Sequence, residues 1–154
     1  MESIQLYQRP GVGDKPIVDE LVAITRELTG EWFTPDVPEY LPRDLMFQDA
    51  LCLKVDDIVA SFIVFTSFGG SLLITLMGTA PSARGQGHGS KLMEAFFDHA
   101  RSLGFADITL LTVPPSVDPS RAATVGFYQK HGFVIEKEYK ELWQNGALQL
   151  RKTL

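Results

Sequence analysis

This sequence has little cysteine, no long apolar runs and no excess of positive charge. One cysteine in 154 residues, Cys52, cannot form an internal disulfide, and no Cys or His cluster has the spacing of a zinc site. No apolar run approaches the roughly 20 residues that span a bilayer, and the first residues lack the basic and apolar regions of a signal peptide. We therefore expect a cytoplasmic protein with no metal and no membrane partner.

The net charge and the length further narrow the class of protein. A formal net charge of −5 argues against a nucleic-acid-binding protein, which would usually show a basic stripe. With 45% apolar and 21% charged residues, the composition is that of an ordinary globular protein. The length suits a single domain over residues 1–154 with one hydrophobic core.

The first half of the chain predicts a helix among consecutive strands. Apolar residues at helical spacing predict a helix over 15–30, after a first alternating strand, "SIQLYQ". Three prolines make 31–45 a loop or a broken helix, whose aromatic side chains either cap the core or line a pocket. Two strands then meet at the acidic turn Asp56–Asp57, and "SLLITLMGTA" reads as a third strand buried on both faces.

The second half predicts a βαβ crossover and a hairpin. After a glycine-rich stretch, one helix face is expected to carry Leu92, Ala95, Phe96, Ala100 and Leu103, and the strand "ADITLLTV" follows. A short helix is expected between an N-cap at Asp118 and a C-cap at Gly132. Asn145 and Gly146 then predict a tight hairpin turn. The expected fold class is α/β (α+β) with a mixed sheet: an antiparallel meander, a βαβ crossover and a C-terminal hairpin.

The glycine-rich stretch "SARGQGHGS" has the character of an anion site. Gly85, Gly87 and Gly89 alternate just before a predicted helix, where backbone N–H groups and the helix dipole bind anions. The alternative is a flexible connection, but three glycines there would carry an entropic cost with no ligand to offset it. We therefore interpret the stretch as a phosphate cradle.

Two familiar phosphate cradles do not match the spacing. The dinucleotide pattern G-x-G-x-x-G and the P-loop pattern both need a glycine where Ser90 stands. The P-loop also needs Ser or Thr where Leu92 stands. A Rossmann chain would moreover begin with its βαβ unit, whereas here a meander precedes it.

The pattern that fits is "T-A-P-S-A-R-G-Q-G-H-G", from Thr79 to Gly89. It closely resembles the GCN5-related N-acetyltransferases, whose signature after a buried strand is V-x-P-x-x-[QR]-G-x-G-x-[GA], and it departs only at Thr79. A second family element, F-Y-x-x-x-G-F, has its match in Phe127, Tyr128, Gly132 and Phe133. The resemblance covers nearly the whole chain.

The resemblance implies an acyl-CoA N-acyltransferase fold that binds acetyl-CoA as acetyl donor. The strands before and after the crossover helix would splay apart, and the pantetheine arm would lie between them. The main chain of Met77 and Thr79 would bond this arm. The pyrophosphate would contact a run of loop residues: Arg84, Gly85, Gln86, Gly87, His88, Gly89 and Ser90.

Tyr128 matches the family's tyrosine near the sulfur, and we assign it the general-acid role, against the alternative of a half-buried aromatic side chain. The general base stays open, because the strand "LLITLMG" has no ionisable side chain. Glu31, Asp36, Asp118 or an ordered water are the candidates. For His88 we favour a phosphate-side or solvent position over a role as base.

Two further departures lie just before the second family element, namely Arg121 in place of a frequent asparagine seven residues before the tyrosine and Thr124 in place of the usual alanine. The expected activity is acetyl transfer to a primary amine by direct attack in a ternary complex. A non-catalytic acyl-CoA-binding or sensing module and a nucleotide-binding protein are the alternatives. The amine is unknown: small amines, amino acids, antibiotics, and protein N-termini or lysines are all open, and so is a homodimer through the C-terminal strands.

Overall fold

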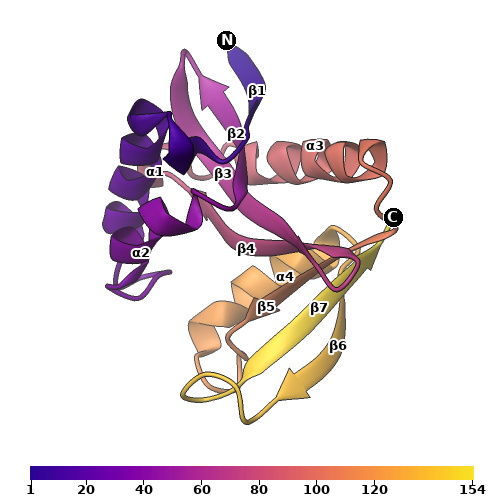
Figure 1. Cartoon of the computed structure of the whole chain (residues 1–154). Helices are drawn as coiled ribbons and strands as arrows, with labels where there is room; N and C mark the ends of the chain where they lie inside the picture. The colour runs from indigo at the N-terminus through magenta and orange to yellow at the C-terminus, as the bar shows by residue number, and fades with distance from the viewer. The chain divides into compact units, whose positions relative to one another are not determined.

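Seven strands follow the order β1-β2-β3-β4-β5-β7-β6 in one mixed sheet of the computed structural model, which describes residues 1–154 (Figure 1). The strands are β1 (Glu2–Tyr7), β2 (Asp49–Val55), β3 (Ile58–Phe68), β4 (Ser71–Thr79), β5 (Asp107–Thr112), β6 (Val134–Tyr139) and β7 (Ala147–Thr153). The helices are α1 (Lys15–Leu28), α2 (Val37–Asp44), α3 (His88–Ser102) and α4 (Ala122–Lys130). Short 3₁₀ helices lie at Pro10–Val12, Pro81–Ala83 and Pro119–Arg121. The expected α/β class with a mixed sheet is confirmed.

The chain forms two compact units. Unit 1 comprises Met1–Thr66 and Leu76–Phe96, and unit 2 comprises Ser67–Thr75 and Phe97–Leu154. Strands β3 and β4 and helix α3 therefore each run from one unit into the other. The expectation of a single domain stays a prediction.

Unit 1 contains two antiparallel strand pairs, and its β2–β3 pair is the first hairpin of the expected meander. Strand β1 pairs with β2, and β2 pairs with β3, with Cys52 opposite Phe62. Asp56 and Asp57 connect β2 to β3 with φ angles of 52° and 67°. Asp tolerates this left-handed backbone better than most residues, so the acidic turn is confirmed.

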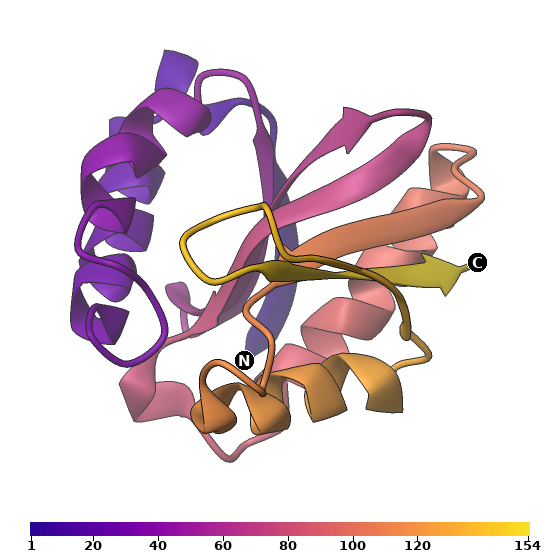
Figure 2. The same ribbon diagram turned by 90° about the horizontal axis from the view of Figure 1, so that it is seen from below.

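Alternation along β2 and β3 divides the apolar side chains of unit 1 between two faces. On one face, α1 and α2 lie side by side (Figures 1 and 2) and share a core with β2 and β3. Trp32 and Phe33 pack against this core, as the core-capping alternative expects. On the other face, Phe65 of β3 meets Phe96 of α3 with ring centroids 4.9 Å apart.

Helix α1 begins at a capping residue, and α2 is a short helix that contains a proline. The Asp14 side chain caps α1 by accepting a 3.3 Å hydrogen bond from the backbone N–H of Ile17. Pro42 lies inside α2, which is therefore short, as expected for a proline-broken helix. No helix combines the length and the apolar character that a membrane crossing requires.

Helix α3 buries three of the five expected positions, Leu92, Phe96 and Ala100, together with two others. Met93 and Phe97 are buried together with Leu92, Phe96 and Ala100. Ala95 is only partly buried, and Leu103 is 52% exposed beyond the end of the helix. The buried stripe therefore consists of adjacent pairs of residues one helical turn apart.

The two strands of the crossover pair within unit 2, although most of the crossover helix α3 belongs to unit 1. Strand β4 pairs with β5 in parallel, from Leu72 opposite Ile108 to Ile74 opposite Leu110, which confirms the βαβ arrangement. Beyond this stretch the expectation that β4 is buried on both faces is wrong, because Thr75 is exposed and the residues from Leu76 to Thr79 are only partly buried. An apolar run in sequence does not show how far neighbours cover a strand.

The C-terminal strands form a hairpin, but not the expected turn. Strand β7 pairs antiparallel with both β5 and β6, so it lies between them. The β6 register ends at Tyr139 opposite Ala147, and the connection over 140–146 is longer than a two-residue turn. Trp143 takes a positive φ of 54° within this connection.

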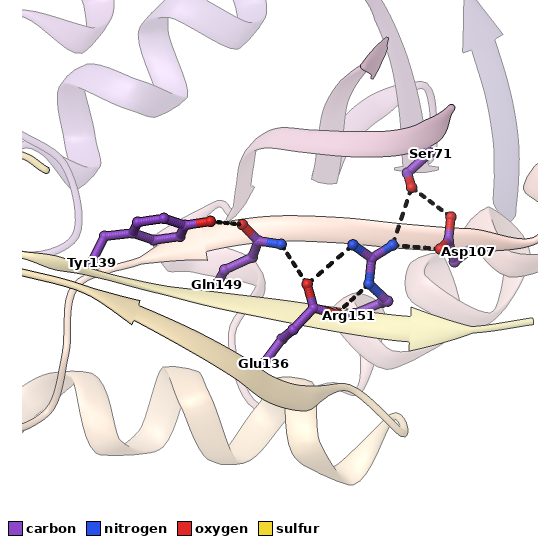
Figure 3. A network of polar contacts seen from close by, with 6 residues as sticks. All are labelled: Ser71, Asp107, Glu136, Tyr139, Gln149 and Arg151. Atoms are coloured by element: carbon purple, nitrogen blue, oxygen red, sulfur yellow. Dashed lines mark hydrogen bonds and ion pairs between the residues drawn. The ribbon is translucent and has the colours of Figure 1, made fainter. Parts of the chain in front are cut away.

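A polar network joins four strands of unit 2 around Arg151 (Figure 3). Its guanidinium donates to the carboxylates of Asp107 and Glu136, while the Ser71 hydroxyl donates to Asp107 at 2.6 Å. The pKa of Asp107 is lowered by the hydrogen bond from Ser71 and by Arg151. The network continues through Gln149, whose amide bonds Glu136 at 2.7 Å, to the hydroxyl of Tyr139 at 3.1 Å. It holds one face of the unit together, and the apolar core lies on the other.

Candidate functional site

The loop between β4 and α3 has the conformation of an open cradle. Gly85 and Gly87 take φ angles of 74° and 78°, which other residues adopt only with strain. A Cβ atom at either glycine would meet nothing within 4 Å, so the space beside the backbone is free. Gln86 between them is exposed. The loop therefore leaves its backbone accessible to a ligand, as a phosphate cradle requires.

Helix α3 starts directly from this cradle. The backbone N–H of Lys91 donates to the Gly87 carbonyl at 3.1 Å, which makes His88 and Gly89 residues of the first turn. First-turn N–H groups have no carbonyl partner within their helix and carry the positive end of its dipole. An anionic group fits this arrangement, because the donors, the dipole and the open space coincide.

His88 is buried, so the solvent alternative for its side chain is wrong. Its Nδ1 atom lies 3.5 Å from Glu2 Oε1 on β1, yet makes no hydrogen bond. Lys91 Nζ reaches both oxygens of the same carboxylate, at 3.0 and 2.7 Å. The hydrogen bond from Lys91 lowers the pKa of Glu2. The first strand is therefore tied to the first turn of α3.

Arg84 is held by the segment that follows α1. Its Nη1 atom lies 2.7 Å from Glu31 Oε1, and its guanidinium lies 5.8 Å from the centre of the Trp32 ring. The Trp32 indole N–H donates to the same Glu31 oxygen at 3.0 Å. Arg84 and Glu31 are both partly exposed, so this pair is screened by water and weak. Arg84 can therefore exchange its carboxylate partner for another anion at small cost.

Two further expected donor-binding residues lie on β4 in unit 1. Met77 and Thr79 are partly buried near the end of the strand. The Thr79 hydroxyl lies 3.0 Å from that of Ser61, which donates to the Gly78 carbonyl at 3.1 Å. The Thr79 side chain thus belongs to a β3–β4 contact, which leaves only its main chain for a ligand.

Tyr128 lies on α4 in unit 2 and is buried. Its ring packs edge-on against Phe127 and Phe133, each at 5.5 Å between centroids. Figure 2 shows α4 running along β7 and β6. Desolvation raises the pKa of Tyr128 to about 12, so its hydroxyl stays protonated at neutral pH. The side chain is therefore a hydrogen-bond donor in an apolar surrounding.

The carboxylates named as candidate general bases are engaged in local contacts, and two of them, Glu31 and Asp118, have a lowered pKa that does not suit a base at neutral pH. The pKa of Glu31 is lowered by the hydrogen bond from Arg84. Asp118 caps the start of the 119–121 turn by accepting from Ser120, and this hydrogen bond lowers its pKa. Asp36 accepts a short hydrogen bond from Thr34. Each carboxylate is already committed to a local structural contact.

The expected site residues therefore fall into two groups. The donor-binding residues on β4, the cradle and α3 belong to unit 1, and Tyr128 belongs to unit 2. Sequence reasoning missed Glu2, which meets His88 and Lys91 from the far end of the chain, and no local signal marks that pairing. Thr124 was noted only as a departure, yet its hydroxyl oxygen is buried without a hydrogen-bond partner.

The family of the chain follows from its sequence. The family model described as "Acetyltransferase (GNAT) domain" matches residues 48–135, more than half of the chain. The chain belongs to the GNAT acetyltransferase family, as the two motifs predict. No curated protein sequence matches it.

Solved structures share its fold. The ribosomal-protein-S18-alanine N-acetyltransferase from Escherichia coli superposes with a TM-score of 0.80 at 14% identity, covering 99% of this chain and 94% of that one. A GNAT acetyltransferase from Elizabethkingia anophelis with acetyl-CoA bound gives 0.74 at 16% identity, covering 99% and 98%. Ard1 from Thermoplasma volcanium gives 0.73 at 20% identity, covering 99% and 97%. The GNAT acyltransferase fold is therefore confirmed over nearly the whole chain.

Proposed function

We propose that this protein is an acetyl-CoA-dependent N-acetyltransferase, which moves the acetyl group to a primary amine by direct attack in a ternary complex. The open glycine cradle at the start of α3 carries the proposal. Gly85 and Gly87 leave their backbone accessible at the positive end of a fifteen-residue helix. A family relative with this fold has been solved with acetyl-CoA bound, which supports the same donor here.

The donor side would be held by the residues of unit 1. The backbone from Arg84 to Ser90 would bind the pyrophosphate, and the main chain of Met77 and Thr79 would bond the pantetheine arm. Arg84 would leave Glu31 for the phosphates, an exchange that the exposed position of the pair keeps inexpensive. When bound, acetyl-CoA would supply an activated thioester as the acetyl source.

Tyr128 would serve the departing thiolate as general acid, donating the proton at Oη. With a pKa of about 12, its hydroxyl is available as a donor throughout the physiological range. A cysteine-like thiol has a pKa of about 8.5 in water, and the same desolvation would raise the pKa of the leaving thiol as well. Burial therefore shifts the proton affinities of the Tyr128 phenolate and of the departing thiolate in the same direction. If Tyr128→Phe keeps wild-type turnover under conditions where chemistry limits the rate, the assignment fails.

The acceptor amine must be neutral to attack the thioester. Because Glu31, Asp36 and Asp118 are committed elsewhere, we propose that a water, or the fraction of amine already neutral, meets this need. A rate that rises with pH in step with the neutral fraction of the amine supports this view. A rate set by a protein group with a pKa below 7 contradicts it.

Thermal unfolding with acetyl-CoA, ATP and NADH is the first test. A ligand at a hundred times its Kd stabilises by about 2.7 kcal/mol, which raises the Tm of a chain this long by about 5 to 10 °C. We expect this shift with acetyl-CoA alone. A larger shift with ATP or NADH contradicts the proposal and favours a nucleotide-binding protein.

Release of free thiol from acetyl-CoA then identifies the acceptor. The panel should include peptides beginning with alanine, because a structural relative is named for such a substrate, together with small amines and lysine peptides. Binding without amine-dependent thiol release would support the alternative, an acyl-CoA-sensing module, which the lack of an uncommitted base favours. A homodimer through β6 and β7 and a cytoplasmic location stay predictions, and light scattering in solution tests the first.

A further inference from the structure

The guanidinium of Arg84 lies in a small cation site that the chain itself provides. Glu31 and Trp32 form this site: the Arg84 Nη1 atom lies 2.7 Å from Glu31 Oε1, and the guanidinium carbon lies 5.8 Å from the centre of the Trp32 ring. A carboxylate beside an aromatic ring suits guanidinium and ammonium groups, because both attract positive charge. The position of Arg84 therefore shows that the Glu31–Trp32 site accepts an organic cation.

Two contacts that do not involve Arg84 hold the Glu31–Trp32 site together. The indole N–H of Trp32 donates to Glu31 Oε1 at 3.0 Å, and the Trp32 ring packs against the core of unit 1. The pKa of Glu31 is lowered mainly by the hydrogen bond from Arg84 and also by that from Trp32. The second hydrogen bond continues to favour the charged carboxylate after Arg84 has left. The site therefore keeps its shape and its negative charge without its present occupant.

Binding of the acyl donor would empty this site. In the proposed function, Arg84 leaves Glu31 for the phosphates of the donor. The side chains of Arg84 and Glu31 are 38% and 53% exposed, so water screens their ion pair and little holds it. Another cation can then take the place of the guanidinium.

The Glu31–Trp32 site lies next to the strand expected to bind the pantetheine arm. A Cβ atom added to Gly78 would lie 3.1 Å from the side chain of Leu28, so the end of α1 packs directly against β4 between Met77 and Thr79. The backbone N–H of Trp32 donates to the Leu28 carbonyl at 2.9 Å. All of these residues belong to unit 1. A molecule held at the site is therefore close to the donor strand.

The charge around the site has the sign that attracts cations. Residues 31–45 include four acidic residues and one basic residue. The whole chain has a formal net charge of −5. A negative potential raises the local concentration of cationic ligands and speeds their association. The long-range field thus favours the same class of ligand as the local contacts.

We infer that the Glu31–Trp32 site binds a second, cationic group of the acceptor, so that the substrate is a primary amine that also carries a guanidinium or ammonium group; this rests on the proposed function. The amine that attacks the thioester must be neutral, so a different group of the substrate carries the charge. Glu31 holds this group and does not take a proton from the attacking amine. Because Arg84 occupies the site until the donor draws it away, donor and acceptor assist each other's binding.

Two probes that differ by one charge test the inference. 4-Aminobutylguanidine carries a primary amine and a guanidinium group, and 4-aminobutylurea has nearly the same shape without the charge. Thiol release at saturating acetyl-CoA gives kcat/KM for each probe, and the ratio of the two values is the charge preference. Calorimetry gives the Kd of 4-aminobutylguanidine with and without saturating CoA, which has no acetyl group to transfer.

We expect wild type to prefer 4-aminobutylguanidine by roughly 5- to 20-fold, and Glu31→Gln to prefer it by less than about twofold. Asp98→Asn is the matched control, because it breaks the exposed ion pair with Arg101 near the other end of α3, and it should keep the preference of wild type. CoA should lower the Kd of 4-aminobutylguanidine about fivefold for wild type. Arg84→Gln should bind this probe without CoA as tightly as CoA-loaded wild type does, since no guanidinium competes for the site.

Three sets of results overturn the inference. If wild type binds acetyl-CoA and acetylates both probes equally well, or if Glu31→Gln keeps the charge preference, the inference fails and the proposed function stands. If CoA does not lower the Kd of 4-aminobutylguanidine, or if Arg84→Gln binds it no better than free wild type, Arg84 does not occupy the acceptor site; this arm decides even where neither probe is acetylated. If wild type does not bind acetyl-CoA, the proposed function itself fails, and the inference fails with it.

Discussion

Replacing Gly87 by alanine should separate ligand binding from backbone strain in the cradle. At φ 78° an alanine costs about 1–2 kcal/mol, and the stiffer unfolded chain offsets about 0.4–1 kcal/mol of this. No atom lies within 4 Å of the added Cβ, so no clash adds to the cost. The net loss of about 1 kcal/mol lowers the Tm by about 3 °C. One charge-assisted hydrogen bond lost to the phosphates weakens acetyl-CoA binding about 10- to 100-fold.

Gly69→Ala is the matched control, because Gly69 has a φ of 60° and equally open space but lies in the turn between β3 and β4. It should lower the Tm by a similar amount and leave the Kd of acetyl-CoA unchanged. Calorimetry and thermal unfolding of both variants make the comparison. Equal weakening of binding by both substitutions, or by neither, would refute the cradle as the donor site.

Three further outcomes are expected. Because the pKa of Tyr128 is raised, its contribution to the free energy of unfolding is fully present below pH 10 and is lost as the pH rises through about 12. Over that range, the free energy of unfolding measured with urea should therefore fall by about 2–3 kcal/mol more for wild type than for Tyr128→Phe. Arg151→Met should destabilise the protein at pH 7, because it removes the partner of Asp107. Since the pKa of Asp107 is lowered, the free energy of unfolding of wild type should decrease as the pH falls below 4, and that of the variant should decrease less. Glu31→Gln should lower the Kd of acetyl-CoA by less than about fivefold, and high salt should abolish the difference, since the pair it breaks is exposed; a higher Kd would mean that Glu31 orients Arg84 for the phosphates.

Local chemistry allowed most of the fold to be predicted. The Asp56–Asp57 turn and the α1 cap depend on residues close in sequence, and both are confirmed. The crossover followed from the order of strand, helix and strand, since such units are almost always parallel.

The predictions that were wrong concerned features set by residues far apart in the sequence. The Asn145–Gly146 pair marks the correct hairpin, but the pairing of β6 with β7 ends at Tyr139. The sequence rules for two-residue turns do not predict where the pairing of the two strands stops. His88 reads as a loop residue, yet Glu2 lies against it from the other end of the chain. The open glycine loop at the start of α3 was predictable because its glycines and the helix start are contiguous, whereas the Thr124 hydroxyl is visible only as an unsatisfied group in three dimensions.

The path of the chain through the two units limits how the protein can be divided. The chain passes from one unit to the other after Thr66, Thr75 and Phe96, so neither unit is a continuous segment. A fragment ending at Phe96 would contain β4 without β5, and the apolar residues Leu72 and Ile74 would lose their parallel neighbours. A fragment starting at Phe97 would lack Ser71, one of the partners of Asp107 and Arg151. We therefore expect neither fragment to fold alone, and activity regained on mixing them would report their reassembly.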